Sequence, residues 1–156
     1  MKMLRHILWW MAFIVAGIAL QAVVPGLDAF AVGIILLLED RDYRDLAWLL
    51  PTFILLQEGM GTGLFGSSVA WYTALILLYK LGRWLFEVNN FFFILLLSTW
   101  FGAAYFGIAW LMAPLQDVPS FDAQGTLDKS LIQALYVPVA WWLLAGLRRW
   151  VVPREE

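Results

Sequence analysis

The stretch KLGRWLFEVNNFFFILLLSTWFGAAYFGIAWLMA, residues 80–113, indicates the class of this protein. It opens with two basic residues, Lys80 and Arg83, and ends in the run 91–113, which has no charged side chain. An apolar run of about 20 residues is long enough to cross the hydrocarbon core of a bilayer as a helix. We therefore predict a transmembrane helix whose basic end lies at one face of the membrane.

Five further apolar segments lie on either side of this one. The chain contains 63% hydrophobic and 14% charged residues, whereas soluble domains have about a quarter charged residues. The segments are continuous apolar runs without alternation, which predicts helices rather than a barrel. The sequence thus predicts an all-α integral membrane protein, with residues 1–156 forming one domain in which six transmembrane helices make one bundle. The predicted spans are about 7–24, 27–38, 46–57, 64–79, 91–113 and 130–147.

The basic residues fall almost entirely on one side of this predicted membrane. All but Lys129 lie at the two ends of the chain or in every second loop, the pattern that marks cytoplasmic segments. Both termini are therefore expected in the cytoplasm. A nucleic-acid partner is not expected, because there is no basic stripe away from the membrane edge. The basic residues on the cytoplasmic side are Lys2, Arg5, Arg41, Arg44, Lys80, Arg83, Arg148, Arg149 and Arg154.

Two of the predicted spans, 27–38 and 46–57, are short. At ~1.5 Å per residue each covers roughly 20 Å of a ~30 Å hydrocarbon core. A re-entrant pair that enters and leaves on the outer side is one alternative, but it would bury the charged loop 39–45 at several kcal/mol per charge. Two short spans in a locally thinned bilayer, or covered by protein, cost less. Six spans are therefore expected.

The most unusual stretch is QEGMGTGLFGSS, residues 57–68, in which four glycines follow a carboxylate. Glycine permits backbone turns and close approach of helices. One interpretation is a bent link that faces a groove or a partner helix, and the other is a tight outer turn with its carboxylate in headgroup water. The candidate partner or groove residues in this stretch are Gln57, Glu58, Gly59, Gly63 and Gly66.

Ala12 and Ala16 in the first span are a second candidate contact. Small residues four positions apart let helix backbones approach closely in lipid, although alanine is also simply frequent in membrane helices. No catalytic, cofactor or metal site is expected, because the chain has no cysteine and a single histidine, His6. His6 is interpreted as a polar residue at the membrane edge, and the protein is not expected to be an enzyme.

The order of motifs along the chain carries a family resemblance. Residues 55–66, LLQEGMGTGLFG, place an acidic residue at the end of the third segment, then small residues, then a Phe-Gly step that opens the fourth. The chain continues into Trp71-Tyr72 and the basic end 81–83, and its last segment contains Pro138 and closes on 147–149. This order resembles the bacterial rod shape-determining protein MreD family, whose members have about this length and six predicted spans.

The resemblance implies a non-enzymatic scaffold of the cell-shape and elongation complex in the bacterial cytoplasmic (inner) membrane. It implies helix–helix contacts with MreC and with the elongation transglycosylase and transpeptidase, besides membrane lipid. It also implies a fold similar to the substrate-binding subunits of energy-coupling-factor transporters. The chain departs from the family in having Glu58 where aspartate is more frequent, in its additional glycines, and in its highly charged 39–45 loop.

Two other functions stay open. A small-molecule-binding subunit of a membrane transporter would need a polar-lined cavity near Glu58 and the outer loop 116–128, and polar residues at membrane depth are scarce. A non-redox accessory subunit of a larger membrane enzyme complex would need no site of its own. The proteins that copurify with the chain distinguish these functions from the scaffold.

Overall fold

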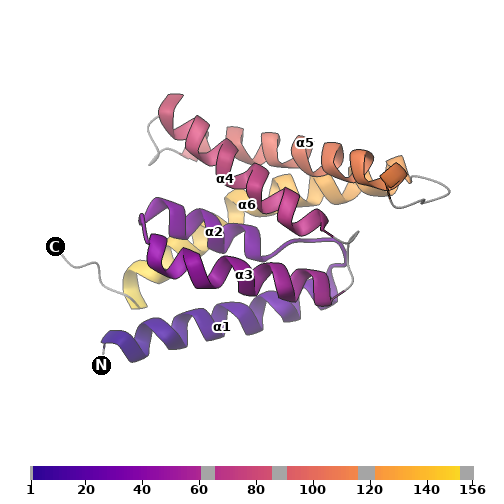
Figure 1. Ribbon diagram of the computed structural model, residues 1–156. Helices are drawn as coiled ribbons and strands as arrows, with labels where there is room; N and C mark the ends of the chain where they lie inside the picture. The colour runs from indigo at the N-terminus through magenta and orange to yellow at the C-terminus, as the bar shows by residue number, and fades with distance from the viewer. Residues whose placement is uncertain (1, 61–65, 86–90, 116–121, 152–156) are drawn as a thin grey trace.

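The computed structural model describes residues 2–60, 66–85, 91–115 and 122–151. These residues form six α-helices and, within the described ranges, no β-strand (Figure 1). The all-helical class predicted from the continuous apolar runs is confirmed. The helices are α1 (Lys2–Val23), α2 (Phe30–Glu39), α3 (Tyr43–Gly59), α4 (Ser67–Leu85), α5 (Phe91–Leu115) and α6 (Ala123–Val151).

Three helices are long and apolar enough to cross a membrane: α1 over Leu4–Val23, α5 over Phe91–Leu115 and α6 over Ala123–Arg148. The helix α2 has only 10 residues and is about 15 Å long. It is shorter than the predicted segment 27–38 because the chain turns after α1, where Gly26 has a φ of +87°. Glycine adopts this left-handed backbone without a steric penalty.

The predicted apolar segments and the observed helices differ most where polar residues form the first turn of a helix. The helix α3 begins at Tyr43, inside the charged loop, because Asp42 accepts a hydrogen bond from the Asp45 N–H and caps it. The helix α6 begins at Ala123, within the predicted outer loop, where the Asp122 carboxylate accepts from the Gly125 N–H at 3.0 Å. Such side-chain caps stabilise the free N–H groups at a helix start.

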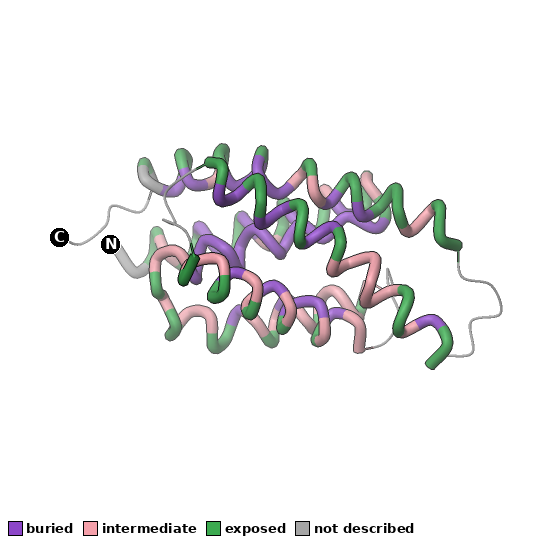
Figure 2. Tube along the Cα trace, turned by 90° about the horizontal axis from the view of Figure 1, so that it is seen from above, coloured by how far each residue is buried: buried purple, intermediate pink, exposed green. Residues whose placement is uncertain are grey.

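The helix α2 lies in the centre of the molecule. All of its residues from Phe30 to Leu38 are buried, and it packs against α1, α3, α4 and α6. The rings of Phe30 and Phe53 stack with centroids 4.9 Å apart. A Cβ added at Gly33 would lie 2.7 Å from the Phe13 ring. The helices α1 and α3 are thus held against α2 by aromatic packing, and Figure 2 shows the buried residues concentrated inside the bundle.

The outer surface of the bundle is apolar. Large hydrophobic side chains on α1, α4, α5 and α6 are half or more exposed, including Met11, Leu77, Phe92, Trp100 and Trp142. A soluble monomer rarely exposes large continuous apolar surface, whereas lipid solvates it. The three long apolar helices and this surface indicate a membrane protein.

Candidate functional site

A buried carboxylate between α1 and α2 is the polar centre of the fold. Asp28 is 1% exposed. Its Oδ1 accepts from the backbone N–H groups of Phe30 and Ala31 at 3.0 and 3.3 Å. The Tyr72 hydroxyl donates to the same oxygen at 3.1 Å, and the Trp71 indole donates to Oδ2 at 2.7 Å. Four donors therefore reach the carboxylate, three at Oδ1 and one at Oδ2, and two of them are free N–H groups at the start of α2.

Side chains of α5 and α6 satisfy the backbone of the turn that contains Asp28. Gln133 is fully buried; its Oε1 accepts from the Asp28 N–H at 2.9 Å and its Nε2 donates to the Asp28 carbonyl at 3.0 Å. The Tyr136 hydroxyl donates to the Ala29 carbonyl at 3.4 Å, and the Tyr105 hydroxyl donates to the Gly26 carbonyl at 3.5 Å. Irregular backbone at membrane depth is tolerated only where protein covers it in this way.

We call Asp28 together with Trp71, Tyr72 and Gln133 the Asp28 network. Asp28 is not among the candidate residues predicted from the sequence, although an ionisable residue inside a predicted span is a signal of function. Its partners could not be read from the sequence, because Trp71 and Gln133 lie 43 and 105 residues away. Trp71 is 4% exposed and Gln133 is 0% exposed, so the network connects three separate parts of the chain inside the protein.

The candidate residue Glu58 connects α3 to α4. Its carboxylate accepts from the Gly66 N–H at 3.0 Å and from the Ser68 N–H at 3.1 Å. A negative charge there also interacts favourably with the helix dipole of α4. Gly66 has a φ of +78°, the left-handed conformation that glycine adopts readily. The structure therefore brings Glu58 and Gly66 together in an intramolecular cap.

The other candidate residues lie on different surfaces. Gly59 is exposed, and a Cβ added there would meet no atom within 4 Å. Gln57 is half-buried beside Glu58, and Gly63 lies outside the described residues. Ala12 and Ala16 are both exposed on the outer side of α1. These two alanines and Gly59 are therefore available for contact with another helix.

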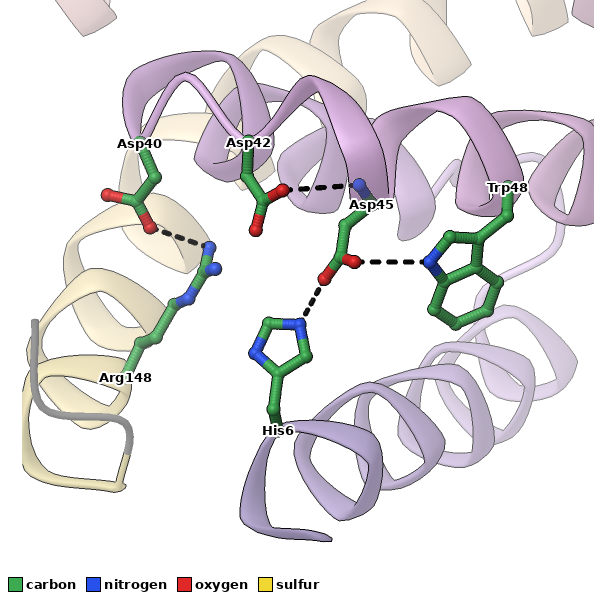
Figure 3. Close-up of polar contacts among 6 residues, drawn as sticks. All are labelled: His6, Asp40, Asp42, Asp45, Trp48 and Arg148. Carbon is green, nitrogen blue, oxygen red and sulfur yellow. Dashed lines mark hydrogen bonds and ion pairs between the residues drawn. The ribbon is translucent and has the colours of Figure 1, made fainter. Parts of the chain in front are cut away.

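A charged cluster lies at the end of the bundle away from the Glu58 cap. Its side chains are shown in Figure 3. The His6 imidazole of α1 contacts Asp45 Oδ2 in the first turn of α3, and the Trp48 indole donates to Asp45 Oδ1 at 3.2 Å. Partial burial favours a higher pKa for Asp45, but the hydrogen bonds from His6 and Trp48 outweigh it and lower this pKa below its ordinary value. Asp45 therefore lies ionised at the junction of α1 and α3.

Arg148 joins α6 to the same end. Its Nη1 lies 3.0 Å from Asp40 Oδ2 just after α2, and its guanidinium carbon lies 5.2 Å from the centre of the Trp10 ring, within cation–π range. The Trp141 indole donates to Glu39 Oε2 at 2.9 Å. We call this part of the bundle the charged end. It comprises His6, Asp40, Asp42, Asp45 and Arg148, which come from α1, α6, the connection between α2 and α3, and the first turn of α3.

A cavity of about 190 Å³ between α4 and α5 has an almost entirely apolar lining that includes Leu78, Phe93 and Trp100. The Ser98 and Ser130 hydroxyls donate to backbone carbonyls of their own helices at 2.8 and 2.9 Å. The polar contacts described above thus connect helices to one another or cap their ends.

Comparison with protein-family models, with curated proteins and with solved structures found no match for this chain.

Proposed function

We propose that this chain is a non-enzymatic scaffold of the bacterial inner membrane that acts through helix–helix contacts with other membrane proteins. In this proposal all six helices form one bundle that spans the bilayer, and both termini lie in the cytoplasm. The short helix α2 crosses together with the turn that precedes it, and the surrounding helices shield both from lipid.

The positions of the loops support this topology. The beginning of α1 and the end of α6 lie at the same end of the bundle in both views (Figures 1 and 2). At that end Arg148 contacts Asp40 in the connection between α2 and α3, and His6 contacts Asp45 in the first turn of α3. These are the segments that the distribution of basic residues assigns to the cytoplasm, so the charge pattern and the packing favour the same orientation.

The observation that carries the scaffold proposal is the use of the Asp28 network and of Glu58 in contacts within the protein. All four donors around the Asp28 carboxylate come from the protein itself, and Gln133 pairs with the Asp28 backbone. Glu58 is engaged in the same way at the start of α4. These contacts hold helices together, while the outer apolar surface stays available for neighbouring helices.

The partners in this proposal come from the resemblance to the MreD family: MreC and the transglycosylase and transpeptidase of cell elongation. The apolar lining of the cavity between α4 and α5 suits a hydrocarbon chain better than a polar solute, and therefore supports the scaffold over a transporter subunit. The exposed small residues Ala16 on α1 and Gly59 at the end of α3 are the proposed contact points.

The test is recovery of partners from the native host in gentle detergent, with the wild-type chain compared with Ala16→Leu and Gly59→Leu. Both positions are exposed, so a leucine there changes the surface without displacing packed atoms. Gly146→Leu on α6 is the matched control, because Gly146 is also exposed and a Cβ there would meet no atom within 4 Å. Gly66→Leu is less informative, since its positive φ would strain any larger residue.

We expect the wild-type chain and Gly146→Leu to recover MreC and the elongation enzymes, and at least one of the other two variants to lose them while still inserting as a folded protein. Recovery of transporter ATPases or of respiratory subunits would replace the scaffold with one of the other two functions. Full recovery of the elongation proteins by every variant would move the contact to another face of the bundle.

A further inference from the structure

We propose that His6, Asp42 and Asp45 form a binding site for a divalent transition-metal ion, with Zn²⁺ the best match, that clamps α1 to the start of α3. Each residue offers one ligand atom, and these atoms all lie within 4.8 Å of one another. The site contains none of the proposed contact residues, so its test is independent of the scaffold function.

The three ligands come from two helices that are far apart in the sequence. His6 lies in the second turn of α1, whereas Asp42 and Asp45 lie at the start of α3. Figure 3 shows the imidazole ring facing the two carboxylates across the gap between these helices. One imidazole nitrogen and two carboxylate oxygens are a donor set that zinc accepts, with a remaining position for water. Because the histidine comes from a separate helix, only the folded chain assembles the site.

Hydrogen bonds from the Trp48 indole and from the Asp45 backbone orient the two carboxylates. The Trp48 indole holds Asp45 Oδ1 at 3.2 Å, which leaves Oδ2 toward His6. The Asp45 backbone N–H holds Asp42 Oδ1 at 3.2 Å, which leaves the second oxygen of Asp42 available. Metal ligands in proteins are commonly fixed by such outer contacts.

Charge and burial also suit a cation. The side chains of His6 and Asp45 are 27% and 14% exposed, so the site is reachable from solvent yet partly shielded from it. The nearby cation Arg148 is engaged by Asp40 at 3.0 Å and by the Trp10 ring. Among the described residues Asp42 forms no ion pair. Two carboxylates therefore face one imidazole, and a divalent cation would balance their charge.

The single histidine allows the metal to be detected at one ligand. The full chain is labelled with ¹⁵N-histidine, its purification tag is removed, and Zn²⁺ is added in a non-ionic detergent while the imidazole nitrogen resonances are recorded. Zinc stoichiometry and affinity are measured in parallel by calorimetry. The variants are Asp42→Asn and Asp45→Asn, and Asp128→Asn is the control because Asp128 is an exposed carboxylate on α6. Asparagine at position 42 remains a good helix cap, so this variant should fold.

We expect one equivalent of Zn²⁺ to shift the Nε2 resonance of His6 in the wild-type chain and in Asp128→Asn. Asp42→Asn and Asp45→Asn should each weaken zinc binding about tenfold or more, because loss of a ligand costs at least as much affinity as loss of a residue that holds a ligand in place. Absence of an imidazole shift in the wild-type chain would overturn the proposal. Unchanged affinity in both carboxylate variants would also overturn it, because the zinc would then bind elsewhere.

Discussion

At the scale of single residues, Asp28 has the least ordinary environment in the protein. A buried carboxylate is costly unless hydrogen bonds compensate for its lost hydration. Asp28 accepts from two backbone N–H groups, an indole and a phenol. The same contacts fix the turn before α2 to α4, and Gln133 fixes it to α6. One residue, through its side chain and its backbone, therefore helps to determine how three helices meet.

Replacing Asp28 should destabilise the folded protein strongly. Asp28→Asn supplies one acceptor oxygen for four donors and leaves buried donors unpaired, so we expect a loss on the order of 3 kcal/mol. Tyr72→Phe removes a single hydrogen bond to the carboxylate and should cost about 1.5 kcal/mol. Both are measured by unfolding the purified protein with sodium dodecyl sulfate in mixed micelles. Asp128→Asn is the control, and an Asp28→Asn variant as stable as that control would contradict the stabilising role of the network.

The role of Asp28 could not be predicted from the sequence, for a physical reason. The pattern of apolar segments correctly predicts the all-helical class, because a helix needs only local periodicity and length. The Asp28 network depends on contacts between residues 43 to 105 positions apart, which local patterns do not encode. Likewise, His6 is a lone histidine in the sequence, and only the packing of α1 against α3 places Asp45 beside it.

At the scale of the helices, the connection between α3 and α4 depends on two kinds of glycine. Gly66 has a positive φ and lies between Glu58 and the start of α4. Gly59 is the last residue of α3, has no positive φ and has open space around it. The sequence shows four similar glycines in this stretch, and backbone conformation is what separates the roles of these two.

These two glycines should respond in opposite directions to the same substitution. Gly66→Ala forces a Cβ into the left-handed region and should cost about 1 kcal/mol. Gly59→Ala reduces the backbone freedom of the unfolded chain without a clash and should stabilise the protein by about 0.5 kcal/mol. Unfolding titrations of the two variants, run side by side, test this. Equal effects of the two substitutions would show that Gly66 does not require its left-handed conformation.

At the scale of the whole molecule, the bundle has two polar ends of different character. The charged end gathers His6, Asp40, Asp42, Asp45 and Arg148. The other end contains the Asp28 network and the cap that Glu58 provides. The distribution of basic residues predicts which loops share a side of the membrane, because lysine and arginine are enriched in cytoplasmic loops. The length of segment 27–38 already predicts a short span, but the sequence leaves open whether protein encloses it, since that depends on how the other helices surround α2.

The six-span bundle with cytoplasmic termini is tested by the side of the membrane on which each loop lies. The chain has no cysteine, so single cysteines can be introduced at exposed Arg44, Gly59 and Gln124 and labelled with a membrane-impermeant maleimide. We predict labelling of Gly59→Cys and Gln124→Cys from outside intact cells, and labelling of Arg44→Cys only after the membrane is opened. Labelling of Arg44→Cys in intact cells would contradict this topology.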